Sequence, residues 1–172
     1  MKNKALIIAI AVLVLVVAVL GFLNRDQLAG KQALVENPAL VLQAKGEELA
    51  VISLDQIRAL GEEEFPITLQ SSGKPPRDLE LTGVSLKAIA YDIDPTLPDR
   101  AEQVVVRAID GYTVAYTVEE VLMDEHIYLV YLEDGKPLGT KADGGSGPLM
   151  MVPRQDEFGQ RWCKFVVEVD FN

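Results

Sequence analysis

Two short polar segments carry residue types that could bind an anion. The first is Ser71-Ser72-Gly73-Lys74, which follows an alternating apolar stretch at residues 65–69. Hydroxyl groups and free backbone N–H groups at the end of a strand could hold an oxyanion or a phosphate, and Lys74 would add positive charge. Local composition by itself favours an ordinary polar turn ahead of the loop at residues 74–78.

The second segment is the glycine-rich stretch at residues 142–148, Ala-Asp-Gly-Gly-Ser-Gly-Pro. It lacks the Gly-Lys-Ser/Thr ending and the following helix of a P-loop. Gly144 and Gly145 could let a backbone approach a ligand closely, or they could belong to a hairpin loop. Asp110-Gly111-Tyr112 is a third candidate, although Asp-Gly is mainly the signal of a two-residue hairpin turn.

The remaining reactive side chains favour structural roles. Cys163 is the only cysteine, so no intramolecular disulfide is possible, and its place at the head of an alternating apolar stretch to Phe171 predicts a core position in a half-buried strand. His126 is the only histidine. Asp124 and Glu125 would raise its pKa if they lie close, and a position at the end of a helix is favoured over a role as general base.

Short strands and brief helices are predicted to position these segments. Capping boxes begin at Ser53 and Thr117, and Ser85 could cap a third helix. The strands are expected at residues 39–43, 65–69, 103–109, 112–117, 127–132, 148–152 and 165–171. No strand–long helix–strand repeat is present, which argues against a doubly wound parallel sheet. The pattern therefore predicts an α+β domain with a mostly antiparallel or mixed sheet.

A membrane anchor is predicted ahead of this domain. Residues 5–23 carry no charge, and as a helix they would span roughly 28 Å, close to a bilayer core. Lys2 and Lys4 favour a cytoplasmic N-terminus, which places the remainder outside the cell membrane as a single-pass protein. A cleaved signal peptide is the alternative. We expect an anchor at residues 1–23, a stalk at 24–38 and a globular domain at 39–172.

The charge of the outer part excludes one class of partner. Without Lys2 and Lys4 it has 14 basic and 26 acidic residues, a formal charge of −12. Such a surface repels nucleic acid, so nucleic-acid binding is set aside. The acidic surface is expected mainly to keep the domain soluble.

The order of several landmarks resembles the molybdopterin-binding domain of the sulfite oxidase family. These landmarks are Thr68-Leu69-Gln70-Ser71-Ser72-Gly73, Leu81-Thr82-Gly83-Val84-Ser85-Leu86, Asp110-Gly111-Tyr112, Gly144-Gly145-Ser146-Gly147-Pro148-Leu149 and Arg161-Trp162. The resemblance covers residues 39–172 and implies that family's fold. It also implies a molybdopterin pocket that includes Ser71, Ser72, Gly73, Asp110, Gly111, Tyr112, Gly144 and Gly145.

The chain departs from the family at its metal ligand. The family's first motif holds a cysteine whose thiolate binds molybdenum, and Ser71 stands at that position, so no metal ligand is assigned. Met150 stands where the family commonly has arginine, and the arginines are scattered along the chain. We expect a binding or accessory module of an extracytoplasmic redox system, with a redox partner protein. The alternatives are an active molybdopterin oxidoreductase and an interaction module with an empty pocket.

Overall fold

The computed structural model describes residues 10–20, 33–34, 36–70, 73 and 75–172. The chain divides into two compact units, residues 1–33 and 34–172. Residues 10–20 form a helix with exposed side chains. Within the described residues, no helix has both the length and the apolar character that crossing a membrane requires. The other residues of the predicted anchor, 5–9 and 21–23, lie outside the described part of the chain.

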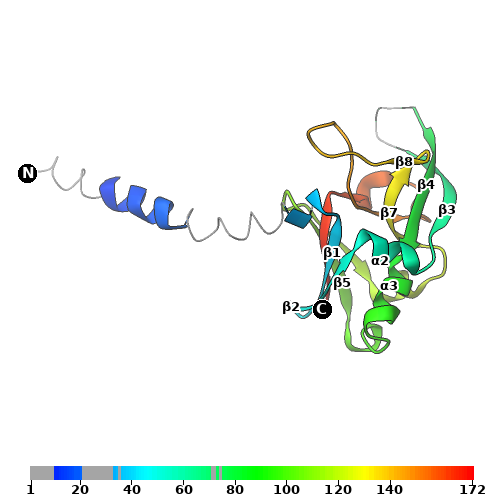
Figure 1. Cartoon of the computed structure of the whole chain (residues 1–172), viewed down its shortest axis with the longest axis horizontal. Helices are drawn as coiled ribbons and strands as arrows, with labels where there is room; N and C mark the ends of the chain where they lie inside the picture. The colour runs from blue at the N-terminus through cyan, green and yellow to red at the C-terminus, as the bar shows by residue number, and fades with distance from the viewer. Residues whose placement is uncertain (1–9, 21–32, 35, 71–72, 74) are drawn as a thin grey trace, which may run out of the picture. The chain divides into compact units, whose positions relative to one another are not determined.

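Two sheets make up the framework of the second unit (Figure 1). The first has the order β2-β1-β11-β5-β6, and the second has the order β10-β9-β7-β4-β3, with β8 paired to β7. The strands are β1 (Ala39–Ala44), β2 (Glu47–Ser53), β3 (Glu63–Leu69), β4 (Arg77–Ser85), β5 (Gln103–Ala108), β6 (Thr113–Thr117), β7 (Ile127–Glu133), β8 (Lys136–Pro137), β9 (Met150–Pro153), β10 (Cys163–Lys164) and β11 (Val166–Phe171). All pairs are antiparallel except β1 with β11. The mixed α+β class is confirmed.

The helices begin where the sequence predicted caps. They are α2 (Leu54–Ala59), α3 (Leu86–Ile93) and α4 (Val118–Leu122), with two short 3₁₀ turns, η1 (Pro98–Arg100) and η2 (Gly159–Arg161). Ser53 and Thr117 each form a complete capping box, and the Ser85 hydroxyl accepts the backbone N–H of Ala88. These local hydrogen bonds satisfy backbone donors that the first helical turn leaves unpaired.

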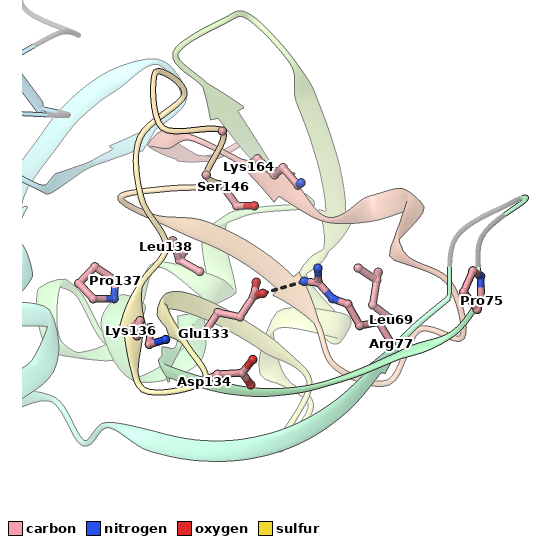
Figure 2. A pocket seen from close by; sticks show the side chains of 12 residues that line it. Leu69, Pro75, Arg77, Glu133, Asp134, Lys136, Pro137, Leu138, Ser146 and Lys164 are labelled. Carbon is pink, nitrogen blue, oxygen red and sulfur yellow. Dashed lines mark hydrogen bonds and ion pairs between the residues drawn. The ribbon is translucent and has the colours of Figure 1, made fainter.

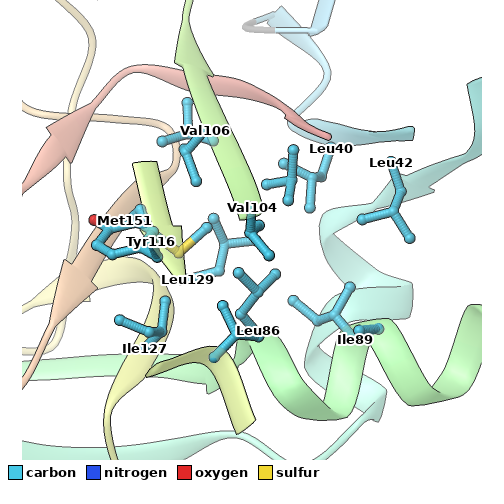
Figure 3. Packing of buried hydrophobic residues seen from close by; sticks show 14 of the residues in the cluster. Leu40, Leu42, Leu86, Ile89, Val104, Val106, Tyr116, Ile127, Leu129 and Met151 are labelled. Carbon is cyan, nitrogen blue, oxygen red and sulfur yellow. The ribbon is translucent and has the colours of Figure 1, made fainter. Parts of the chain in front are cut away.

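The main core joins the first sheet to one face of the second. Leu40, Val104 and Tyr116 come from the first sheet, and Leu129 comes from β7 (Figure 3). A second apolar cluster covers the other face of β7, where Tyr128 and Val130 are buried. Since β7 is buried on both faces, its sequence is continuously apolar instead of alternating.

Two strands and one continuous stretch differ from the sequence expectation. β2 was not predicted, and Arg77 and Asp78, expected in a loop, begin β4. The two prolines that indicated a loop precede the strand, so they remove no hydrogen bond from it. The predicted alternation from Cys163 is also broken, because Phe165 has a φ of 58° and separates β10 from β11, which belong to different sheets.

Candidate functional site

A pocket of about 550 Å³ lies beside the end of β3 and the start of β4. It is lined by Leu69, Pro75, Arg77, Glu133, Asp134, Lys136, Pro137, Leu138, Gly144, Gly145, Ser146 and Lys164. Figure 2 shows Arg77 directed at Glu133, with Ser146 and Lys164 coming from other parts of the chain. The volume lies in the range of pockets that hold small molecules.

Some polar side chains of the pocket form hydrogen bonds or ion pairs with other residues, and others do not. Arg77 donates to Glu133 Oε1 at 2.7 Å, and Asp134 Oδ1 accepts the backbone N–H of Glu80 at 3.0 Å. Lys136 and Lys164 have no carboxylate within ion-pair distance among the residues that the structure describes. The lining therefore contains three cations against two carboxylates, and within the described residues neither ammonium group lies in an ion pair.

The segment that contains Ser71 connects two residues of this pocket. Leu69 and Pro75 both line it, while Ser71, Ser72 and Lys74 lie outside the described residues. The carbonyl of Gln70, next to Ser71 in the chain, accepts the backbone N–H of Gly159 at 3.2 Å. Gly73, which is described, has a φ of 75°, in the region that glycine adopts without strain.

The glycine-rich segment also reaches the pocket, and its own packing accounts for Gly145. The backbone N–H of Gly145 donates to Thr140 at 2.8 Å, and that of Ser146 donates to Leu138 at 3.0 Å. A Cβ at Gly145 would lie 2.3 Å from the carbonyl oxygen of Leu138. Glycine is therefore required at position 145 by the close packing of this loop's own backbone. Gly144 and Gly145 remain part of the pocket wall.

The turn at Asp110-Gly111-Tyr112 does not line the pocket, and its side chains contact Lys141 and Gln160, which do not line it either. Asp110 Oδ2 lies 3.3 Å from Lys141 Nζ, and the Tyr112 hydroxyl donates to the Gln160 carbonyl at 3.1 Å. A backbone hydrogen bond from Tyr112 holds the pKa of Asp110 below its usual range. The hairpin is present, but four residues, 109–112, separate β5 from β6 instead of the two residues expected.

Neither Cys163 nor Met150 is placed to hold a molybdenum cofactor in this pocket. Cys163 is fully buried in the main core, and burial raises the pKa of its thiol to about 12. No cluster of three or more His, Cys, Asp or Glu suited to a metal occurs in the described part of the chain. The position of Met150 is also apolar, since its side chain is buried in the second cluster with Trp162.

The arginines of the described residues are all engaged with carboxylates. Each of Arg58, Arg77, Arg100, Arg107, Arg154 and Arg161 lies in an ion pair. Folding therefore does not gather them into a free basic cluster. A pterin phosphate needs such donors, so these arginines do not fit that group.

His126 does not line the pocket, and its pKa is shifted in the opposite direction from the one that its acidic sequence neighbours suggest. It is 5% exposed, and it lies beyond the end of α4, directly before β7. Asp124 and Glu125 pair instead with Lys87 and Arg154. Burial lowers the pKa of His126 below its usual 6.5, against the opposing effect of Asp156 and Glu120. Its Nδ1 accepts the backbone N–H of Gln155 at 3.3 Å.

We expect acid to destabilise the domain partly through His126. The unfolded chain takes up this proton near pH 6.5, whereas the folded chain takes it up only at lower pH, so stability falls as the pH decreases below about 6.5. Urea unfolding of the full-length chain at pH 7.5, 6.5 and 5.5 measures the slope. His126→Gln should flatten it, and an unchanged slope would contradict this assignment.

Comparisons with known proteins support the fold alone. Neither protein-family models nor curated proteins match the chain. Among solved structures, the sulfane dehydrogenase SoxCD from Paracoccus pantotrophus is similar, with a TM-score of 0.60 and 13% sequence identity. The similarity covers 77% of this chain and 37% of that chain. The chain has a molybdopterin-oxidoreductase-like fold. The fold that the sequence resemblance implied is therefore confirmed. The chain spans little more than a third of the length of the SoxCD chain.

Sequence reasoning did not identify several residues of the pocket. Glu133, Asp134 and Lys136 lie where β7 turns into β8, and nothing in the local sequence indicated that this turn faces a pocket. Lys164 lies in a stretch that was expected to be one alternating strand. Only the separation of β10 from β11 brings Lys164 to the pocket.

Proposed function

We propose that the chain is a binding module that retains the molybdopterin-oxidoreductase fold and binds a small anion without molybdenum. The pocket beside the end of β3 carries this proposal, because two of its three cations lack a carboxylate partner within the described residues. The chain has a formal net charge of −10, so a locally positive pocket is a selective place for an anion on an acidic protein.

The size and polarity of the pocket favour a small, polar ligand. Lys136 and Lys164 supply ammonium donors, and the Ser146 side chain lies beside Lys164 (Figure 2). Arg77 is already committed to Glu133, and Asp134 would repel a second negative group. The lining therefore suits one compact anionic group better than an extended polyanion such as a pterin phosphate.

The donor chemistry argues against molybdenum. A thiolate is softer than an alkoxide and deprotonates far more readily, so serine at position 71 is a poor replacement for the family's ligand. The single cysteine is held in the core with a raised pKa. A role in molybdenum chemistry would require a ligand other than these two residues.

The cellular setting in this proposal rests on the sequence. The uncharged run at residues 5–23, preceded by Lys2 and Lys4, supports a single-pass anchor with the domain outside the cell membrane. A binding module held there would act as an accessory to a redox system, presenting its ligand to a partner protein. The fold's similarity to an oxidoreductase favours that setting.

Titration with sulfate tests the pocket. We expect sulfate to shift amide resonances of Ser146 and Lys164 in ¹⁵N-labelled full-length chain. Lys164→Gln should weaken sulfate binding about fivefold, the effect of losing one exposed charge contact of about 1 kcal/mol. Lys87→Gln is the matched control, because Lys87 lies on α3 and pairs with Asp124, outside the pocket. Equal weakening by both variants would overturn the proposed site.

Metal and pterin content tests the other half of the proposal. The full-length chain, purified from a host that makes the cofactor, should contain no stoichiometric molybdenum or pterin, and Ser71→Ala should not change this. Stoichiometric amounts of both would overturn the proposal and favour an active oxidoreductase. Cofactor uptake by Ser71→Cys alone would show that only the ligand has been lost. Absence of both cofactor and sulfate binding would favour the empty-pocket interaction module.

A further inference from the structure

A second pocket, of about 320 Å³, lies where β1 and the parallel strand β11 end. It shares no lining residue with the pocket beside β3. Its floor is apolar, since Leu97 and Phe171 line it and each is 1% exposed. A ligand of this pocket would therefore bury apolar surface against fixed core side chains, which is the usual basis of small-molecule affinity.

A β-bulge brings an additional aliphatic side chain to this pocket. Leu42 pairs with Ala50 and Gln43 pairs with Glu48, so Leu49 is an extra residue on β2. Bulges of this kind redirect a side chain at the edge of a sheet. Leu49 lines the pocket and stays 43% exposed, although aliphatic side chains of this size are usually buried. An apolar ligand would cover it.

The rim of the pocket carries two cations and one carboxylate. Lys45 has a φ of 52° and forms a tight turn with Gly46, and its backbone N–H donates to the Phe171 carbonyl at 3.0 Å. Within the described residues, Lys45 has no carboxylate at ion-pair distance. Arg100 also lines the pocket and is paired with Asp94, and Glu47 supplies the negative charge.

We propose that this second pocket binds a small amphiphilic anion, an aliphatic carboxylate. Its hydrocarbon chain would cover Leu49, Leu97 and Phe171, and its carboxylate would meet Lys45. Arg100 is already paired with Asp94, so the ammonium group of Lys45 is the main partner of the ligand's carboxylate. This site is independent of the proposed function, because neither its residues nor its ligand involves the pocket beside β3.

Hexanoate is a suitable probe, with hexanol and hexylamine as controls for its charge. In ¹⁵N-labelled full-length chain, hexanoate should shift the amides of Lys45, Leu49 and Phe171, with a dissociation constant on the order of 1 mM for so small a ligand. Hexanol and hexylamine should bind more weakly. Equal or tighter binding of hexylamine would overturn the proposal, because it would assign recognition to Glu47.

Paired variants separate the two parts of the site. Lys45→Asn removes the charge and creates Asn-Gly, the preferred dipeptide of such a turn, so folding is protected. It should weaken hexanoate binding about threefold to fivefold, and Lys45→Arg should not. Leu49→Thr should weaken binding about fivefold by removing apolar contact.

Val51→Thr is the matched control, since Val51 is 50% exposed on the same strand and does not line the pocket. It should leave hexanoate affinity within twofold of the unchanged chain. Equal effects of Leu49→Thr and Val51→Thr, or shifts centred on the pocket beside β3, would contradict the assignment of this second site.

Discussion

Replacing Gly83 by alanine is expected to destabilise the folded chain by about 3 kcal/mol, at the upper end of the usual cost of overpacking. A Cβ at Gly83 would lie 2.5 Å from the carbonyl oxygen of Leu129 and 3.0 Å from the Cα of Val130. Both contacts are with the backbone of β7, which is buried on both faces and cannot move aside as a flexible side chain could.

The cost at Gly83 is steric, and a second glycine provides the comparison. Gly135 has a φ of 71°, and a Cβ there meets nothing within 4 Å, so Gly135→Ala should cost about 1 kcal/mol through backbone strain alone. Urea unfolding of the full-length chain, followed by circular dichroism, measures both variants. A cost at Gly83 no larger than at Gly135 would show that β4 and β7 do not approach this closely.

This prediction also changes the meaning of a sequence landmark. Gly83 belongs to the Leu81–Leu86 segment that carries part of the family resemblance, and the structure places it at the register shift between β4 and β7. Glycine is therefore needed at this position because β4 and β7 approach each other closely there. Such a packing requirement belongs to the fold, and it gives no evidence for a cofactor.

Local hydrogen bonding explains which elements the sequence predicted correctly. A capping box needs only residues three apart, so Ser53 and Thr117 identified two helix starts without tertiary information. Five of the seven residues of β2 are exposed, one is partly buried and only Ile52 is buried, so the strand lacks the alternation of a half-buried strand. Its position at the edge of the sheet, and the bulge at Leu49, explain this weak pattern.

The pocket was only partly predictable, because its charge balance depends on contacts between distant segments. Gly144 and Gly145 were identified from their composition and line the pocket. Leu69 and Pro75, which lie on either side of the Ser71-Ser72-Gly73-Lys74 candidate, also line it. Composition could not show which arginines form ion pairs in the folded chain. Arg77 meets Glu133 across 56 positions of sequence, and Arg107 meets Glu168 across 61. Only the fold decides whether a cation is neutralised or remains available to a ligand.

Arg161 provides the second large expected effect, because it joins three separate parts of the domain. Its Nε and one terminal nitrogen donate to the two oxygens of Asp156 at 2.7 and 2.6 Å, and its other nitrogen donates to Glu120 at 2.7 Å. Glu120 in turn caps α4 by accepting the backbone N–H of Thr117 at 2.8 Å. The guanidinium also lies 5.4 Å from the centre of the Tyr116 ring.

Arg161→Gln should cost about 2 kcal/mol at pH 7, because it leaves the half-buried carboxylates of Glu120 and Asp156 without their shared cation. Burial pushes the pKa of Glu120 up, but the hydrogen bonds from Thr117 and Arg161 outweigh it and hold that pKa below 4.5. The Glu120 carboxylate therefore stabilises the folded chain above about pH 4.5, and this contribution is lost as the pH falls through the lower pKa of the folded state.

In the variant, Glu120 protonates more readily, so the difference in stability should shrink at pH 4. Urea unfolding of both full-length chains at pH 7 and pH 4 measures this change. Arg77→Gln is the matched control, because Arg77 meets one carboxylate and its side chain is 60% exposed, so it should cost about 0.5 kcal/mol or less. An equal cost for Arg161→Gln at both pH values would show that the loss comes from packing against Tyr116 and not from the two carboxylates.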